Sequence, residues 1–308
     1  MLDRDFFRTY RPLPSPFWEW VGAHSWRTLE KIAGTKVVFE NFEPPSTPVV
    51  FATNSTQKYD FMPIRVELER RKIPTVTITK GKNYHSAVGG FLLSRLGVLP
   101  IVSRGYVLMV DFTSVLKRRP SESEYRALRS HLDEGLALPA ELNALRDTRR
   151  TLLGHDYEPP DYRALLQRVY AGAMSETVRL AREAVAAGSH VHIYPEGTVS
   201  TRLGTGRIGA VQLAHALRLP IVPVGMSGCR EAMFFRGGPI TIRFGKPIHV
   251  SLPNDLKPFD PEDEKRHRNI LLAATEQVMA GIDALLEPAQ QRREGFTGDG
   301  TQGTKRFL

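Results

Sequence analysis

The chain has 308 residues, of which 41% are hydrophobic and 24% are charged, which is enough for one large α/β domain without requiring a second. Its 42 basic residues exceed its 33 acidic ones and give a net charge of +9, which favours an anionic partner: a phosphorylated substrate, an anionic bilayer surface or nucleic acid. The single cysteine, Cys229, excludes an internal disulfide and a cysteine-rich zinc site and indicates a reducing compartment.

The first 34 residues predict an amphipathic helix on a membrane surface. Apolar residues recur at helical spacing over positions 17–33, all three tryptophans lie in this stretch, and Gly34 is a typical C-terminal stop. Tryptophan prefers the headgroup boundary because its ring is apolar while its N–H is polar, and Arg27 and Lys31 would face anionic lipid. The alternative is that this helix packs on the protein's own core.

The sequence favours a cytoplasmic protein that is peripheral on the inner face of the membrane. The first residues lack the basic and apolar regions of a secretion signal. The most apolar later stretch, residues 88–102, is interrupted by Arg95 and Pro100 and is shorter than the roughly 20 apolar residues that span a bilayer.

From residue 35 to 287 the pattern predicts one α/β domain, a mixed twisted sheet flanked by helices. Short apolar runs predict strands at 36–40, 49–53, 75–79, 99–102, 190–194, 221–226 and 240–244. Helical periodicity predicts helices at 62–71, 88–96, 175–187 and 210–217.

Two further segments differ from this pattern. Residues 117–168 are charged and predict a helical insertion in two or three pieces, broken by Pro139, Gly154 and the pair Pro159-Pro160. Its basic clusters suit either a solvated surface or a platform facing anionic lipid. The tail 288–308 has no periodicity and is predicted to be disordered.

The predicted strand 190–194 runs into Pro-Glu-Gly-Thr, which places a carboxylate, hydroxyls and bare backbone at a strand-to-loop junction. Such groups suit an anion, because Gly197 lets the backbone come close and hydroxyls donate to it. The candidate binding residues are Arg104, Glu196, Gly197, Thr198, Ser200, Arg202 and Arg207. A carboxylate repels an anion, so Glu196 would either bond an acceptor hydroxyl or hold Arg104. A turn with incidental surface arginines is the alternative.

Four blocks in this order resemble the glycerolipid acyltransferase family. Residues 54–60 are similar to the family's Asn-His-x-Ser-x-x-Asp block, and residues 97–104 to a block that runs from Gly to Arg. Residues 194–200 resemble Phe-Pro-Glu-Gly-Thr-Arg-Ser, with Tyr194 for Phe and Val199 for Arg, and residues 221–224 resemble a Val-Pro-Val core. The resemblance covers about residues 35–250.

This resemblance implies an acyltransferase-like fold and a 1-acylglycerol-3-phosphate O-acyltransferase-like reaction in phospholipid synthesis. A fatty acyl group would pass from acyl-CoA or acyl-carrier protein, as a substrate rather than a cofactor, to a lysophospholipid or related hydroxyl acceptor. The candidate binding residues would then hold the acceptor's phosphate. Val199 stands where the family pattern has an arginine, so the sequence leaves open whether the acceptor carries the usual phosphate.

The family's histidine position is occupied by Ser55. In the family that imidazole takes the proton from the acceptor hydroxyl and the aspartate, here Asp60, orients it. A serine hydroxyl is no base near pH 7, so three readings stay open. The chain is a weakened or non-catalytic homologue that binds acyl chains, phosphate or membrane. Alternatively, His85 or His192 is the base. In the third case Ser55 itself carries the acyl group, activated by Asp60 or one of these histidines, or the alignment differs locally.

Other function classes find no support in the sequence. There is no Gly-Lys-Ser/Thr phosphate loop, paired-histidine metal motif or internal repeat, so neither a metal nor a cofactor is expected. The basic tail residues are compatible with nucleic acid, but no recognition helix, zinc motif or pattern of stacking aromatics accompanies them, so nucleic acid is not an expected partner.

Overall fold

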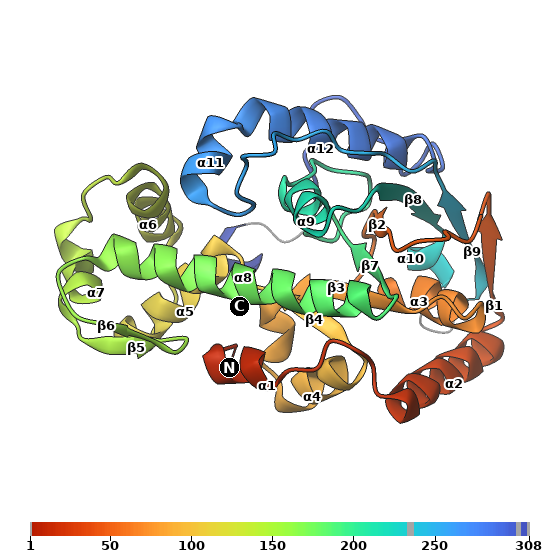
Figure 1. Cartoon of the computed structure of the whole chain (residues 1–308), viewed down its shortest axis with the longest axis horizontal. Helices are drawn as coiled ribbons and strands as arrows, with labels where there is room; N and C mark the ends of the chain where they lie inside the picture. The colour runs from red at the N-terminus through yellow and green to blue at the C-terminus, as the bar shows by residue number, and fades with distance from the viewer. Residues whose placement is uncertain (1, 233–236, 300–302, 307–308) are drawn as a thin grey trace.

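The computed structural model describes residues 2–232, 237–299 and 303–306 and is built around a seven-stranded sheet (Figure 1). The strands are β1 (Thr35–Glu40), β2 (Val50–Thr53), β3 (Thr75–Lys80), β4 (Val98–Ile101), β7 (His190–Ile193), β8 (Ile221–Ser227) and β9 (Gly238–Phe244). Their order is β1-β9-β8-β2-β7-β3-β4, and every neighbouring pair is parallel except β8 and β9. The predicted fold class, a mixed sheet flanked by helices, is confirmed.

All seven predicted strands are present, with ends within two residues of the prediction. The central strands β2, β7 and β8 are buried along their whole length, as expected for parallel strands that are covered on both faces. Parallel strands place their carboxyl ends at one edge of the sheet, where ligands commonly bind in open α/β folds. The loops that follow β2, β3, β4 and β7 therefore meet at that edge.

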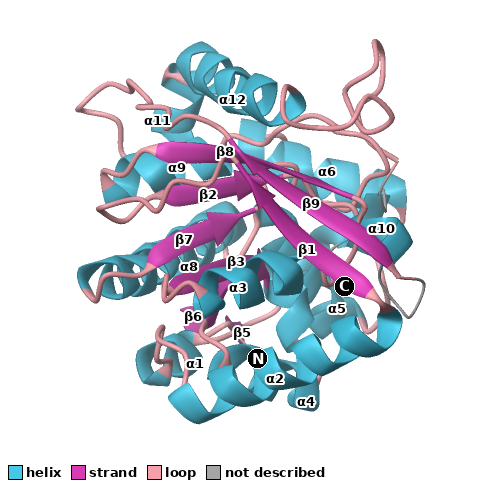
Figure 2. Cartoon of the chain, turned by 90° about the vertical axis from the view of Figure 1, so that its right-hand side faces the viewer, coloured by secondary structure: helices cyan, strands magenta, loops and turns pink. Residues whose placement is uncertain are grey.

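Helices cover both faces of the sheet (Figure 2). On one face α8 (Tyr162–Ala186), α9 (Gly209–Leu217) and α12 (Arg268–Asp283) pack over the larger hydrophobic core. On the other face α2 (Pro16–Ala33) and α3 (Phe61–Arg70) cover a smaller core around Phe51 and Phe244. No helix in the described part of the chain is both long and apolar enough to cross a membrane.

The predicted N-terminal helix is α2, and it ends at Gly34 in the left-handed conformation, with φ of 67°. A short helix, α1 (Arg4–Thr9), precedes it. Of the two alternatives, packing on the protein's own core describes one side of this helix, and exposure of apolar side chains describes another. Trp26 packs against the smaller core, whereas Phe17 and Trp20 are 62% and 56% exposed. Its contact with a membrane stays a prediction.

The region 117–168 contains more than helices. It holds α6 (Glu122–Glu134), η2 (Ala140–Leu142), α7 (Asn143–Asp147) and a hairpin of β5 (Arg150–Leu152) and β6 (His155–Tyr157). Gly154 lies in the turn of this hairpin, with φ of 81°, rather than at a helix break. The predicted boundary at residue 168 falls inside α8, which continues unbroken from the insertion to the sheet (Figure 1).

The tail differs from its predicted disorder in the residues that the structure describes. Leu203 N–H donates to the Gln290 carbonyl over 2.8 Å, and the Asp299 carboxylate accepts from Thr201 N–H, also over 2.8 Å. The short helix η3 (Gly303–Arg306) lies beside α6, where Thr304 N–H donates to a carboxylate. Residues 300–302 and 307–308 of the predicted tail lie outside the described residues.

The remaining elements complete the chain. They are η1 (Gly81–Tyr84), α4 (Ala87–Arg95), α5 (Arg104–Leu116), α10 (Cys229–Ala232) and α11 (Pro261–Arg266).

A buried carboxylate attaches the insertion to the domain. Asp111 of α5 is fully buried, and its two oxygens accept from Nε and Nη2 of Arg150 in β5, each over 2.7 Å. The Tyr162 hydroxyl at the start of α8 donates to the same carboxylate over 2.6 Å. The Arg150 guanidinium also lies over the rings of Tyr157 and Tyr162, at 4.9 and 5.3 Å from their centroids. One carboxylate thus joins α5, the hairpin and α8.

Replacing Arg150 by Met should lower the free energy of unfolding by about 3–5 kcal/mol, because it leaves the buried Asp111 charge without its cation. The measurement is urea unfolding followed by circular dichroism. The neighbouring Arg149→Met is the matched control, since its ion pair with Glu158 is exposed and should be worth less than about 1 kcal/mol. Equal losses in the two variants would contradict this role of Asp111.

Candidate active site

A cavity of about 690 Å³ opens at the carboxyl edge of the sheet. The loops after four strands contribute to its wall: Ser55 and Asp60 after β2, Lys82 after β3, Arg104 after β4 and Gly197 after β7. The first and third family-like blocks, far apart in the sequence, therefore lie at one site. β2 and β4 are three strand spacings apart in the sheet, so the cavity extends over roughly 14 Å along this edge.

The cavity wall combines positive charge with apolar surface. Its basic side chains outnumber its acidic ones by six to two: Lys58, Lys80, Lys82, Arg104, Arg129 and Arg207 against Asp60 and Glu264. Burial, and then repulsion from Lys58 and Arg119, lowers the pKa of Lys82, so a bound anion would relieve this crowding. Apolar side chains such as Phe61, Ile78 and Met174 line the same space. This combination suits an anionic amphiphile.

Asp60 is the acid that ends the first block. Its Oδ2 accepts from the backbone N–H groups of Thr56 and Gln57, over 2.8 and 3.2 Å. Burial raises the pKa of this carboxyl to about 6, against the lowering effect of the Tyr194 hydroxyl, these two N–H groups and the Ser55 hydroxyl. An acid with a pKa near 6 can gain or lose a proton at a small free-energy cost near neutral pH, which suits acid–base chemistry.

Glu196 of the Pro-Glu-Gly-Thr motif has a different partner from those predicted. Its Oε1 accepts from Ser55 N–H over 3.1 Å, and its Oε2 accepts from Gly204 N–H over 2.7 Å. The carboxylate therefore joins the loop after β2 to the loop at residues 200–205, and it does not hold Arg104. Burial raises its pKa to about 7.

The turn that follows Glu196 lines the cavity. Gly197 has φ of 58°, and a Cβ there would lie 3.1 Å from Nε of Arg207. Nε of Arg207 donates to the Glu196 carbonyl over 3.0 Å, which fixes this arginine beside the turn. Thr198 and Val199 also line the cavity. The missing side chain at Gly197 thus lets the Arg207 side chain lie against this backbone.

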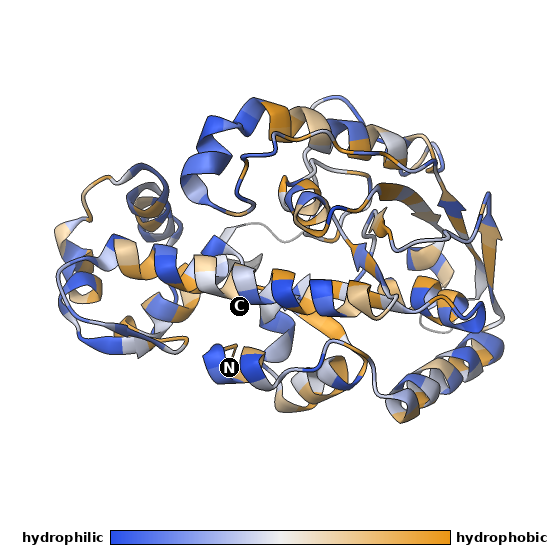
Figure 3. Ribbon diagram, in the orientation of Figure 1, coloured by the Kyte–Doolittle hydropathy of each residue, from blue (hydrophilic) through white to orange (hydrophobic). Residues whose placement is uncertain are grey.

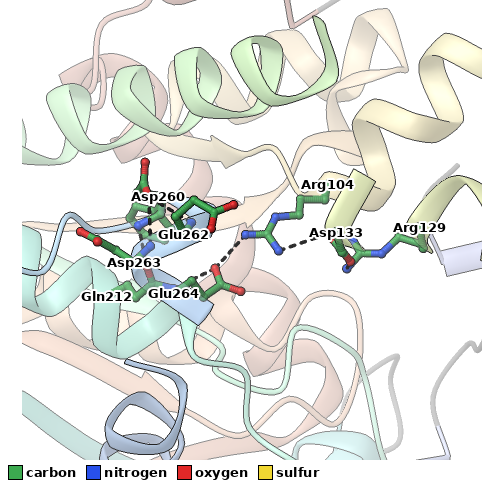
Figure 4. Close-up of polar contacts among 9 residues, drawn as sticks. Arg104, Arg129, Asp133, Gln212, Asp260, Glu262, Asp263 and Glu264 are labelled. Carbon is green, nitrogen blue, oxygen red and sulfur yellow. Dashed lines mark hydrogen bonds and ion pairs between the residues drawn. The ribbon is translucent and has the colours of Figure 1, made fainter. Parts of the chain in front are cut away.

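Arg104 lines the cavity but already has anionic partners (Figure 4). Its Nη2 donates to Oε2 of Glu264 over 2.9 Å and its Nη1 to Oδ1 of Asp133 over 3.4 Å. Its guanidinium also lies 5.0 Å from the ring centroid of Tyr170. Arg104 thus connects α5 with α6 and α11, and it is less suited than predicted to hold a ligand phosphate.

Neither of the two histidines predicted as substitute bases lines the cavity. His85 directly follows η1, and its Nε2 lies 2.8 Å from the hydroxyl of Tyr106, which does line the cavity. His192 is buried inside the sheet, where its Nε2 lies 3.1 Å from the Thr53 hydroxyl. Burial, together with the charge of Arg65, lowers the pKa of His192 to about 3, which makes it a poor base.

Two predicted binding residues belong to the packing of the tail. Ser200 is buried, and its Oγ donates to Oδ1 of Asp299 over 2.8 Å while its N–H donates to the Ser55 carbonyl. Arg202 donates to the carbonyls of Pro288 and Gln291. Neither side chain is part of the cavity wall.

Sequence reasoning missed the lysines of the cavity, Lys58, Lys80 and Lys82. A signal was present, because Lys80 and Lys82 directly follow a predicted strand whose end lies at the same edge as the other blocks. No group of three or more potential metal ligands occurs in the described ranges 2–232, 237–299 and 303–306.

Comparisons with known proteins bear on one segment of the chain. Residues 164–227 match the family model described as Acyltransferase, a stretch that includes the third and fourth blocks. The match confirms the predicted resemblance over these residues. No curated protein matches the sequence.

One similar solved structure is the 1-acyl-sn-glycerophosphate (LPA) acyltransferase PlsC from Thermotoga maritima. The two chains are 13% identical, with a TM-score of 0.40, over 85% of this chain and 78% of that chain. A superposition this loose supports no conclusion about this chain.

Replacing Glu196 by Gln should change how stability depends on pH. The folded pKa of about 7 lies above the ordinary 4.5, so the folded state holds this proton more tightly than the unfolded state. The linked stability is present below pH 4.5 and is lost as the pH rises through 7. Glutamine does not titrate, so the stability of the variant relative to wild type should increase over this window.

The measurement is the free energy of unfolding of both proteins from pH 4.5 to 8. Asp60 is present in both proteins. Burial, and then the charge of Asp60, raises the pKa of Glu196, so the difference reports Glu196 together with its coupling to Asp60. At low pH the variant should be less stable by about 1–3 kcal/mol, because an amide oxygen cannot serve both backbone donors and the NH₂ group disturbs one of them. A difference that stays constant with pH would show that Glu196 is not the buried acid described above.

Proposed function

We propose, from the acyltransferase-family segment at residues 164–227, that the protein transfers a fatty acyl group to a hydroxyl group of a lysophospholipid or related acceptor. The donor is a thioester, acyl-CoA or acyl-carrier protein. The observation that carries the proposal is the cavity itself, in which Asp60, with a pKa of about 6, shares one wall with basic and apolar side chains.

The cavity suits both parts of such a reaction. Lys58, Lys80 and Lys82 supply positive charge near Asp60 for an acceptor that carries a phosphate. The apolar surface between α5, α8 and the sheet, with Ile101 and Met174, suits an acyl chain. Arg104 is engaged by Glu264 and Asp133, so we assign it to shaping the cavity rather than to the phosphate.

Asp60 is the proton acceptor in this proposal. The Asp60 carboxylate takes the proton of the acceptor hydroxyl, directly or through one water molecule. The hydroxyl oxygen then forms the ester bond with the thioester carbonyl carbon, the C–S bond breaks, and the thiolate leaves and regains the proton from Asp60. Ser55, smaller than an imidazole, leaves space for the acceptor or the water beside this carboxylate.

A second function fits one specific observation. Ser55 provides no imidazole, and neither His85 nor His192 lines the cavity to replace it. A homologue that binds acyl chains or lysolipids without turnover would have this composition. The same experiment separates the two functions.

Replacing Asp60 by Asn should reduce kcat/KM with acyl-CoA and a lysophospholipid by about 10²–10⁴-fold, the contribution of a general base. In the wild type, log kcat/KM should rise with pH up to about 6, where Asp60 becomes ionised, and then level off. The measurement is release of free thiol from purified protein. His85→Gln is the control and should keep its activity, because this side chain is outside the cavity.

The Ser55→His variant is the second part of this activity experiment. It adds an imidazole beside Asp60, and a gain in turnover would show that the site still positions both substrates. If the wild type binds acyl-CoA but releases no thiol while Ser55→His does, the protein is the non-catalytic homologue. Turnover that is unaffected by Asp60→Asn would refute the assignment of Asp60 as the base.

A further inference from the structure

Helix α4 is apolar yet has no buried residue. Its exposed side chains Val88, Phe91 and Leu92 follow helical spacing on one face, and they are 70%, 45% and 41% exposed. A helix of this composition normally covers a core. Here the described part of the chain leaves this face open to solvent.

The start of α2 extends this face. The ring of Phe91 packs edge-on against Trp18, which packs in the same way against Phe17, with 5.5 Å between centroids in each case. The two helices lie side by side at the lower edge of the molecule in Figures 1 and 2. Together with Leu13, which is 44% exposed, these residues form what we call the aromatic surface: Leu13, Phe17, Trp18, Val88, Phe91 and Leu92.

Exposed arginines lie on the same segments as the aromatic surface or next to them in the chain, and α1 also carries the exposed Asp5. Arg8, Arg11 and Arg95 are exposed, and within the described ranges none of them forms an ion pair with a carboxylate. The Arg95 guanidinium lies 5.1 Å from the ring centroid of Phe91. Figure 3 shows hydrophilic and hydrophobic residues alternating along α2, as in a helix that lies at an interface. The one nearby acid on α2, Glu19, is paired with the buried Arg65.

The start of α4 is close in the chain to residues of the cavity wall. α4 begins three residues after η1, whose Lys82 and Asn83 line the cavity. Contiguous exposed apolar surface edged by polar groups marks protein or membrane contact, and the uncompensated arginines favour an anionic bilayer over a protein.

We propose that the aromatic surface of α2 and α4 docks the protein on the surface of a bilayer that contains anionic lipid. Phe17, Phe91 and Leu92 enter the boundary between headgroups and acyl chains, and Arg8, Arg11 and Arg95 contact lipid phosphates. Trp26, predicted from sequence to take part, instead packs inward. This docking does not depend on turnover.

The test is co-sedimentation of the full chain with vesicles of phosphatidylcholine, alone or with phosphatidylglycerol. Phe17→Ser combined with Phe91→Ser should weaken binding to the mixed vesicles at least tenfold. The matched control is Ile270→Ser combined with Leu272→Ser on α12, at the opposite side of the molecule, where the side chains are exposed to 44% and 42%. The control should bind like wild type.

A charge variant distinguishes headgroup contact from non-specific adhesion. Arg11→Gln and Arg95→Gln should each weaken binding to phosphatidylglycerol vesicles about fivefold, as expected for about 1 kcal/mol per basic residue at an anionic surface, and should change binding to phosphatidylcholine little. Circular dichroism checks that the variants are folded.

Three outcomes would overturn the proposal. The control and the aromatic-surface variant bind equally; the arginine variants bind both vesicle types like wild type; or wild type is a dimer without lipid and Phe91→Ser makes it a monomer, which would assign the surface to a second copy of the chain. Because vesicle binding is measured without substrates, a failure of acyl transfer leaves this result unchanged.

Discussion

The Glu196 carboxylate joins the two loops on which the site is built. It accepts one hydrogen bond from the loop after β2 and one from the loop at residues 200–205, and both bonds are shielded from water. A buried backbone N–H without an acceptor is costly, so this side chain, together with the direct hydrogen bond from Ser200 N–H to the Ser55 carbonyl, fixes the two loops relative to each other. Around these hydrogen bonds lie Asp60, Gly197 and Arg207. The strand-end motif therefore acts as much through its packing as through any contact with a ligand.

The elements that were predicted well from the sequence are those whose residues meet the same kind of surroundings along the whole element. Central strands such as β2 and β8 are short apolar runs covered on both faces, and such runs are visible without knowledge of the fold. Helix α5 escaped prediction for the opposite reason. Eight consecutive residues from Gly105 to Phe112 are buried, so the helix has no polar face and its sequence shows no period. The tail is held by scattered contacts, among them the Asp299 carboxylate, the Arg202 side chain and backbone hydrogen bonds, which leave no periodic pattern in its sequence.

The candidate site was predictable in part, because family-like spacing identified Asp60 and Gly197 and the parallel sheet brought them together. Spacing alone could not separate residues that face the cavity from residues that face the core. His192 and Ser200 have suitable chemistry but are buried in packing contacts. Lys58 and Lys82 became visible only when the strand ends were aligned. Which side of a strand or loop faces a cavity depends on neighbours that are distant in the sequence.

Helix α8 restricts how the insertion can move relative to the sheet. Its 25 residues form a rod of roughly 37 Å that begins at the Asp111 cluster and ends beside β7. The same rod supplies Tyr170 and Met174 to the cavity wall. A swing of the whole insertion would have to bend this helix or tilt it across the sheet, so the insertion behaves as a fixed wall. The ion pairs of Arg104 with α6 and α11 tie this wall to both sides of the cavity.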